Sequence, residues 1–118
     1  MNEAKGWEGV NPDELGPPKG WTNGMLAPAG GRILLVAGQD AATAEGIVEE
    51  EDFVRQFDLA LAKTLVVVRN AGGDPTSIGR MTVFVTDLDA YRESRKAIGE
   101  VWRARMGRHY PAMALVEV

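Results

Sequence analysis

The strongest constraint on the fold comes from two short runs, residues 33–36 and 81–85, that are apolar at almost every position. Strands with this pattern are typical of sheets that are covered on both faces. A chain of 118 residues is too short to form a third layer over the second face of the sheet once its helices cover the first. Self-association of several copies is the simplest cover for the other face. The alternative is a monomer that tolerates a partly apolar outer face.

Glycine pairs and apolar spacing divide the rest of the chain into elements. Gly30-Gly31, placed before residues 32–37, predicts a hairpin that returns to a short strand near Met25 and Leu26. Apolar residues at helical spacing predict a first helix over residues 49–71, and Gly72-Gly73 supplies its stop.

The second half continues with a strand, a helix and a last strand. Residues 81–85 are predicted to form the strand, after which Asp87 or Asp89 is expected to cap a helix that runs to about Met106. Gly107 ends that helix, and residues 112–118 read as the last strand.

The predicted order is therefore β-β-α-β-α-β, an α+β fold. Right-handed crossovers should place both helices on the same face of one sheet. We predict a single domain over residues 1–118, with an irregular arm over residues 1–24, where three prolines interrupt regular structure.

The charge balance and the residue types exclude several classes of function. With 17 acidic and 13 basic residues, the net charge of -4 leaves no surplus of cations to neutralise phosphates, so no nucleic-acid partner is expected. Cysteine is absent and His109 is the single histidine, so we expect no metal. We interpret His109 as a loop residue, with a catalytic base as the alternative. No apolar run approaches the roughly 18 residues of a membrane span and no secretory signal is visible, which predicts a cytoplasmic protein without membrane contact.

Three stretches resemble, in order and spacing, the signatures of the Rid (YjgF) family. They are Val36-Ala37-Gly38-Gln39, Met81-Thr82-Val83-Phe84-Val85-Thr86-Asp87-Leu88, and Tyr110-Pro111-Ala112-Met113 followed by Val116-Glu117-Val118. The resemblance covers about residues 20–118. It implies a chorismate-mutase-like subunit that forms a homotrimer with a ligand cleft at each subunit interface. Family deaminases hydrolyse enamines and imines to a keto acid and ammonia, and they need no cofactor.

The resemblance also points to ligand-binding positions, and this chain departs from the family at several of them. The arginine that grips the substrate carboxylate falls at Met113, whose thioether has no charge and no donor. The serine of the family's SGQ motif is Ala37, the tyrosine before it corresponds to Trp21, and an asparagine of the second helix maps near Arg95. The candidate ligand-binding residues are Trp21, Thr22, Asn23, Ala37, Gly38, Gln39, Arg95 and Met113.

Structural alternatives stand beside these assignments. Trp21 could pin the N-terminal arm, and Met113 could be a plain core side chain. Arg95 shares a helical stripe with Ile98 and Trp102, so either its stem packs on Trp102 or its guanidinium supplies the anion grip that Met113 lacks. The family has a further C-terminal strand, which bears a glutamate thought to position the attacking water. We expect the protein to continue into it, because a chain that ends at an apolar strand leaves a bare sheet edge.

These observations lead to one main hypothesis and two alternatives. The main hypothesis is an interface site that binds or acts on an enamine, an imine or a related nitrogenous carboxylate, with weak or no 2-aminoacrylate deaminase activity. No catalytic residue is assigned, so a hydrolase of altered specificity and a non-catalytic ligand-binding module both stay open. The acidic balance and the single histidine disfavour an endoribonuclease or translation inhibitor, two labels that family members have carried.

Overall fold

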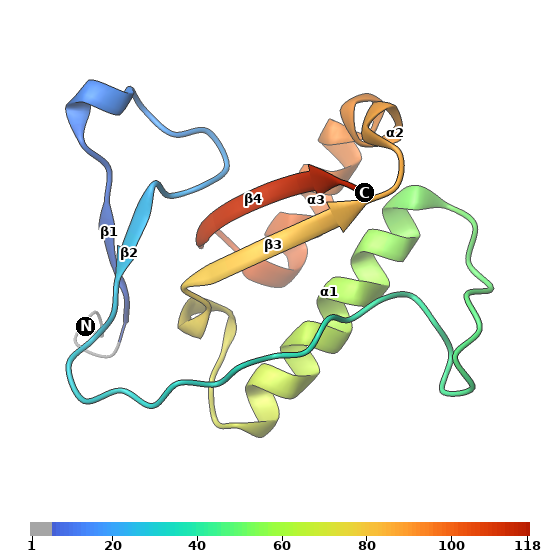
Figure 1. Ribbon diagram of the computed structural model, residues 1–118, viewed down its shortest axis with the longest axis horizontal. Helices are drawn as coiled ribbons and strands as arrows, with labels where there is room; N and C mark the ends of the chain where they lie inside the picture. The colour runs from blue at the N-terminus through green and yellow to red at the C-terminus, as the bar shows by residue number, and fades with distance from the viewer. Residues whose placement is uncertain (1–5) are drawn as a thin grey trace.

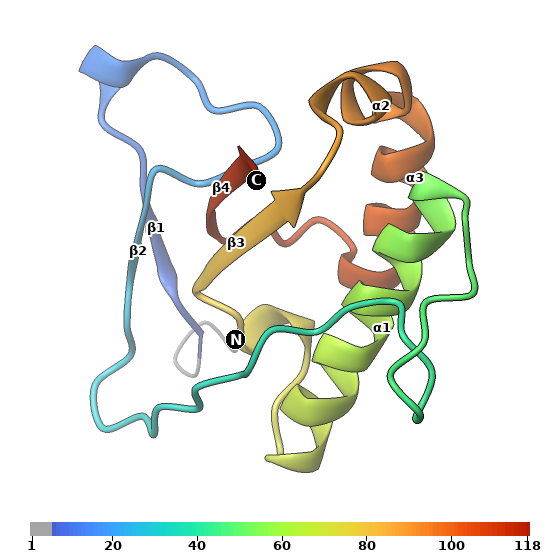
Figure 2. The same ribbon diagram turned by 45° about the vertical axis from the view of Figure 1, so that its right-hand side comes forward.

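The computed structural model describes residues 6–118, and its centre is a parallel pair of strands backed by two helices (Figure 1). Strand β3 (Arg80–Val85) pairs with β4 (Ala112–Glu117), so that Met81 lies opposite Met113 and Val83 opposite Leu115. Helices α1 (Phe53–Asn70) and α3 (Arg95–Met106) lie on the same side of this pair (Figure 2). The predicted α+β class, with both helices on one face, is confirmed.

Helix α1 begins later than the apolar spacing predicted. Its N-cap is Asp52, whose side chain accepts a hydrogen bond from the backbone N–H of Arg55 at 2.9 Å. Glu50 precedes the helix and accepts from Arg55 Nε at 2.8 Å, and this bond lowers the pKa of the Glu50 carboxyl. Asp52 therefore caps the helix from outside its first turn, where a carboxylate stabilises the exposed N–H groups.

The segment between β3 and β4 contains two helices where one was predicted. Asp87 caps α2 (Leu88–Glu93) by accepting from the backbone N–H of Ala90 at 3.0 Å. Ser94 then donates its N–H to the carbonyl of Tyr91, a tight three-residue turn that ends α2 before α3 begins. Serine favours helix ends over helix interiors, which accounts for the break. Gly107 ends α3, as expected.

The core lies between the two long helices and the inner face of the sheet. Leu61, Leu65, Trp102 and Met106 are buried there. Met81 and Met113, which are opposite each other in the strand pair, pack against this cluster. The Trp102 ring stacks on Tyr110 with the ring centroids 6.0 Å apart. The central contact between the layers is therefore made by methionine, leucine and aromatic side chains.

The N-terminal part of the chain departs from the predicted hairpin. Strand β2 (Gly24–Leu26) pairs antiparallel with β1 (Glu8–Val10) and not with residues 32–37, so the prediction of a hairpin through Gly30-Gly31 is wrong. A local sequence pattern can indicate a strand, but it does not determine which strand pairs with it. Here the backbone hydrogen bonds of β2 are made with β1.

The predicted arm is consequently more regular than expected. It contains β1 and a one-turn 3-10 helix, Asp13–Leu15, while its residues 1–5 lie outside the described part. The prediction of one sheet also fails, since β1–β2 and β3–β4 form separate two-stranded sheets.

Residues 32–37 cross the molecule without regular secondary structure. Ile33 is 87% exposed and Leu35 is 88% exposed, although both belong to the run that predicted a buried strand. Residues 6–118 therefore do not bury the apolar side chains of Ile33 and Leu35.

Strand alternation divides β3–β4 into an inner and an outer face. Met81, Val83 and Val85 face the helices, whereas Phe84 faces away and is 66% exposed. We call the opposite side the outer face; it comprises Arg80, Thr82, Phe84, Ala112, Ala114 and Val116. Residues 6–118 leave it open, as the apolar strand pattern led us to expect. Within the same residues, no helix is both long and apolar enough to span a bilayer.

Leu65→Ala tests the packing between α1 and the sheet. Leu65 has no exposed surface, so its truncation should leave a cavity and lower the free energy of unfolding by about 3 kcal/mol. Val66→Ala is the matched control, because its neighbouring side chain is 56% exposed and should change stability by less than about 1 kcal/mol. Urea unfolding followed by circular dichroism measures both, and equal losses would contradict the assigned core.

Candidate functional site

The N-terminal segment that contains the paired strands β1 and β2 contacts the β3–β4 sheet at the residues that precede β3 and β4. Thr22 donates its backbone N–H to the Pro111 carbonyl at 3.1 Å and its hydroxyl to the Tyr110 carbonyl at 2.5 Å. Trp7 donates its indole N–H to the Ser77 carbonyl at 2.8 Å. We call this region the arm–sheet junction; its residues are Trp7, Thr22, Ser77, Gly79, Tyr110 and Pro111.

Gly79 allows the Trp7 ring to reach the junction. A Cβ at Gly79 would lie 2.5 Å from two ring atoms of Trp7, closer than any real contact. The Gly79 carbonyl accepts from the backbone N–H of Ala112 at 3.0 Å, so the backbone there is held on its other side. Only a residue without a side chain lets the ring lie on this segment.

Three of the predicted site residues lie beside the junction. Trp21 is 42% exposed and donates its indole N–H to Asn23 Oδ1 at 3.1 Å. Asn23 in turn donates its backbone N–H to Asn11 Oδ1 at 2.8 Å. The arm thus holds Trp21 through polar contacts, while much of its ring surface stays exposed next to Thr22.

Met113 lies close to the junction in the chain but faces the other way. It is partly buried and packs against the core cluster between the helices and the sheet. Strand alternation places Ala112 and Ala114, its neighbours in the chain, on the outer face. Met113, which the sequence motifs predict to stand in place of the family's arginine, is therefore a core side chain in this structure.

The structure does not bring Ala37, Gly38 and Gln39 to the junction. They belong to the stretch without regular structure, and the Gln39 side-chain amide donates to the nearby Ala37 carbonyl at 3.2 Å. The loop that follows is tied to α1, since Lys63 Nζ donates to the carbonyl of Ala42 and lies 4.0 Å from Asp40. Lys63 also lines a hollow of about 340 Å³ beside this loop.

Arg95 is the first residue of α3, which follows α2 after the C-terminal end of β3, whereas the junction lies where β3 and β4 begin. It is exposed, and its Cζ lies 5.9 Å from the centroid of the Tyr91 ring. Ile98 and Trp102, which lie three and seven residues further along α3, are buried, whereas Arg95 at the start of the helix is exposed. The break at Ser94 places Arg95 at the N-terminal end of α3, where its guanidinium lies against the Tyr91 ring.

His109 is engaged in structure near the junction. Its Nε2 lies 2.6 Å from the Ile78 carbonyl, which accepts a hydrogen bond and so assigns the ring proton to Nε2. Its own carbonyl accepts from the Trp102 indole at 3.1 Å. Within residues 6–118, no group of three or more histidine, aspartate or glutamate side chains could hold a metal ion.

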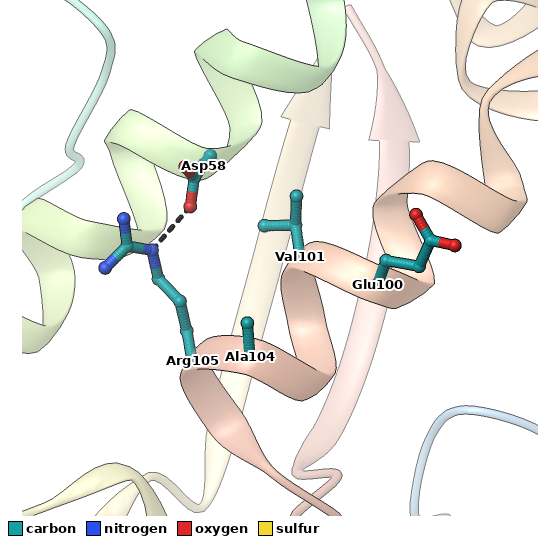
Figure 3. A pocket seen from close by; sticks show the side chains of 5 residues that line it. All are labelled: Asp58, Glu100, Val101, Ala104 and Arg105. Carbon is teal, nitrogen blue, oxygen red and sulfur yellow. Dashed lines mark hydrogen bonds and ion pairs between the residues drawn. The ribbon is translucent and has the colours of Figure 1, made fainter.

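A second hollow lies between α1 and α3, on the side of the helices away from the sheet (Figure 3). It measures about 440 Å³ and is lined by Asp58, Glu100, Val101, Ala104 and Arg105. Arg105 Nε contacts Asp58 Oδ1 at 2.5 Å, and this hydrogen bond raises the pKa of the guanidinium. The sequence offered no sign of this pair, because the helix crossing that joins its members is a tertiary feature.

Gly79→Ala tests the junction. The added methyl group should displace the Trp7 indole, and its fluorescence emission should shift to longer wavelength as the ring becomes more hydrated. Gly38→Ala is the control, because a Cβ there meets nothing within 4 Å. The variants should be compared in a Trp21→Phe background, which removes the other exposed indole. An unchanged emission spectrum in Gly79→Ala would contradict the close approach of Trp7.

Comparison with known proteins identifies relatives of this chain. The family model described as endoribonuclease L-PSP matches residues 14–118. A search of curated proteins found no match. Among solved structures, the Rid-family protein YyfB of unknown function from Yersinia pestis has 25% identity and a TM-score of 0.78, with 96% of this chain and 86% of that chain covered.

Two further structures carry other descriptions. A candidate endonuclease from Aeropyrum pernix has 34% identity over 70% of this chain and 69% of its own, with a TM-score of 0.59. A protein from Rhodopseudomonas palustris, described as a translation initiation inhibitor, has 22% identity over 95% of this chain and 84% of its own, with a TM-score of 0.62. The family model and the YyfB structure agree with the motifs in the sequence, and this chain belongs to the Rid (YjgF) family.

Proposed function

We propose that this protein binds a small nitrogenous carboxylate, such as an imine or enamine of an amino acid or the corresponding 2-oxo acid, in clefts between copies of the chain. The observation that carries the proposal is the open outer face of β3–β4, which begins at the arm–sheet junction. One chain supplies only one wall there. Membership of the Rid family supports a site of this kind, but the site has to be argued from the residues of this chain.

Exposed apolar side chains support assembly into a homotrimer. Phe84 is 66% exposed and Val116 is 41% exposed on the outer face, and Ile33 and Leu35 add further apolar surface. Surfaces of this kind commonly mark contacts between protein chains. Packing the outer faces of three copies around an axis would remove them from water and close clefts beside each junction. The trimeric number itself follows from the family resemblance.

Binding is better supported than turnover. Contacts at the junction involve hydroxyl, indole and backbone groups, and the nearby His109 ring is bound to a carbonyl. A general base has to reach the proton or the water that it activates. Met113, which replaces the family arginine, packs in the core. We therefore propose at most slow hydrolysis of 2-aminoacrylate, and we place a non-catalytic ligand-binding role first.

Light scattering and titration calorimetry test this proposal together. The protein should have a mass of about three chains of 12.8 kDa and should bind 2-oxobutanoate. Phe84→Glu adds a charge to the outer face and should abolish both assembly and binding. Val66→Glu, on an exposed part of α1, should change neither. A native mass of one chain, or tight and salt-dependent binding of an RNA oligonucleotide in place of the oxo acid, would overturn the proposal.

Replacing Met113 with arginine should not create a deaminase. Loss of a bidentate arginine contact costs about 2 to 4 kcal/mol in transition-state binding, so the native protein should release ammonia from 2-aminoacrylate about 30- to 1000-fold more slowly than an arginine-bearing relative. Met113→Arg should destabilise the fold by about 3 kcal/mol, because the guanidinium enters the core. Met113→Leu is the control and should be nearly neutral. Full activity in Met113→Arg would show that this side chain reaches the ligand.

A further inference from the structure

The proposed ligand carries a carboxylate, so its site needs a cation that lies on the outer face. Met113 carries no charge and faces the core. Arg95 lies against Tyr91 at the opposite end of the strands from the junction. An arginine fork binds a carboxylate through two parallel hydrogen bonds and is the side chain best suited to this task.

Arg80 occupies the required place. It is the first residue of β3, it is exposed, and it lies opposite Ala112 in the register of the strand pair. Pro111, the residue before Ala112, accepts the backbone hydrogen bond from Thr22 at 3.1 Å. The guanidinium of Arg80 therefore lies where the outer face meets the arm–sheet junction.

The charge of Arg80 has no acidic partner among residues 6–118. Its Nη1 donates to the carbonyls of Met81 and Ala112, the latter at 3.3 Å. Both acceptors are neutral backbone groups. By contrast, Arg55 and Arg105 each pair with a carboxylate, Glu50 and Asp58 respectively. Carbonyl contacts orient the guanidinium without neutralising it, so the remaining donors and the full positive charge are available to an anion.

The side chains beyond Arg80 fit the rest of a small carboxylate. Ala112 and Ala114 give the outer face a low floor beside Arg80 and Thr82, and Phe84 and Val116 follow with apolar surface. A strand rises about 3.3 Å per residue, so Thr82 lies about 7 Å and Phe84 about 13 Å along the strand from Arg80. A carboxylate at Arg80 would place a chain of a few carbons over the alanines and direct its apolar end toward Phe84.

We infer that Arg80 binds the ligand carboxylate on the outer face and selects short monocarboxylates with an apolar chain. The inference rests on the proposed function and names the specificity-determining residue of that site. A dicarboxylate would place its second charge further along the outer face, whose residues include no second cation. An uncharged amide of the same shape would leave the guanidinium without its anion.

Calorimetric titration of the full chain with 2-oxobutanoate and 4-methyl-2-oxopentanoate tests the inference. Arg80→Gln should raise the Kd for both acids by about 10- to 100-fold, the range expected when a hydrogen bond to a charged group is lost. Arg80→Lys should recover part of the affinity, because it restores the charge without the fork. The amide 2-oxobutanamide should bind weakly to the native protein and equally weakly to Arg80→Gln.

Two matched variants and a mass measurement complete the design. Arg69→Gln makes the same change of net charge at an exposed residue of α1 and should leave the Kd unchanged. Arg95→Gln tests the rival cation and should also be neutral. Circular dichroism and light scattering confirm that each variant is folded and assembled.

The outcomes separate this inference from the proposed function. Native protein that binds none of these acids would overturn both. Native binding with an unchanged Kd in Arg80→Gln would overturn only the role of Arg80, and so would a loss confined to Arg95→Gln. Loss of assembly in Arg80→Gln would show that Arg80 pairs with an acidic group of a neighbouring copy, which also overturns its role as the ligand contact.

Discussion

The parallel pairing of β3 with β4 is the constraint on which the rest of the structure depends. Its register places Met81 beside Met113 and Val83 beside Leu115, so one face of the pair presents a continuous apolar surface to α1 and α3. Leu65 and Trp102 are buried against the inner side of that arrangement. A shift of β3 by one residue would turn Met81 outward and place Arg80 or Thr82 against the helices.

The same alternation creates the outer face and determines what it can recognise. Because inner and outer residues alternate, a strand that contributes Met81 to the core must present Arg80 and Thr82 on the other side. The two alanines of β4 keep that side low, and Phe84 makes its far end apolar. The cation and the apolar surface of the proposed site therefore both follow from the packing of the other face of the strands against the helices.

The arm–sheet junction positions the N-terminal residues through backbone contacts. Thr22 is held by two carbonyls at the start of β4, and Trp7 lies on Gly79 at the start of β3. The carbonyls of Tyr110 and Pro111 precede β4 and accept from Thr22, which satisfies these backbone acceptors. The arm is therefore placed by the ends of the strands, and its position follows from the same strand pair.

The sequence by itself determined the elements whose signals are local. The spacing of apolar residues indicated α1 and α3, Asp87 and Gly107 marked helix ends, and the apolar strands together with three family motifs predicted the fold class and an open second face. Only the tertiary structure decided which segments pair and where the site candidates lie. Strand β2 pairs with β1 and not with residues 32–37, Met113 packs in the core, and Arg95 is exposed against Tyr91 at the start of α3. These outcomes depend on contacts between distant segments, because a strand's partner and a side chain's face are chosen by the burial of the whole layer and not by neighbouring residues.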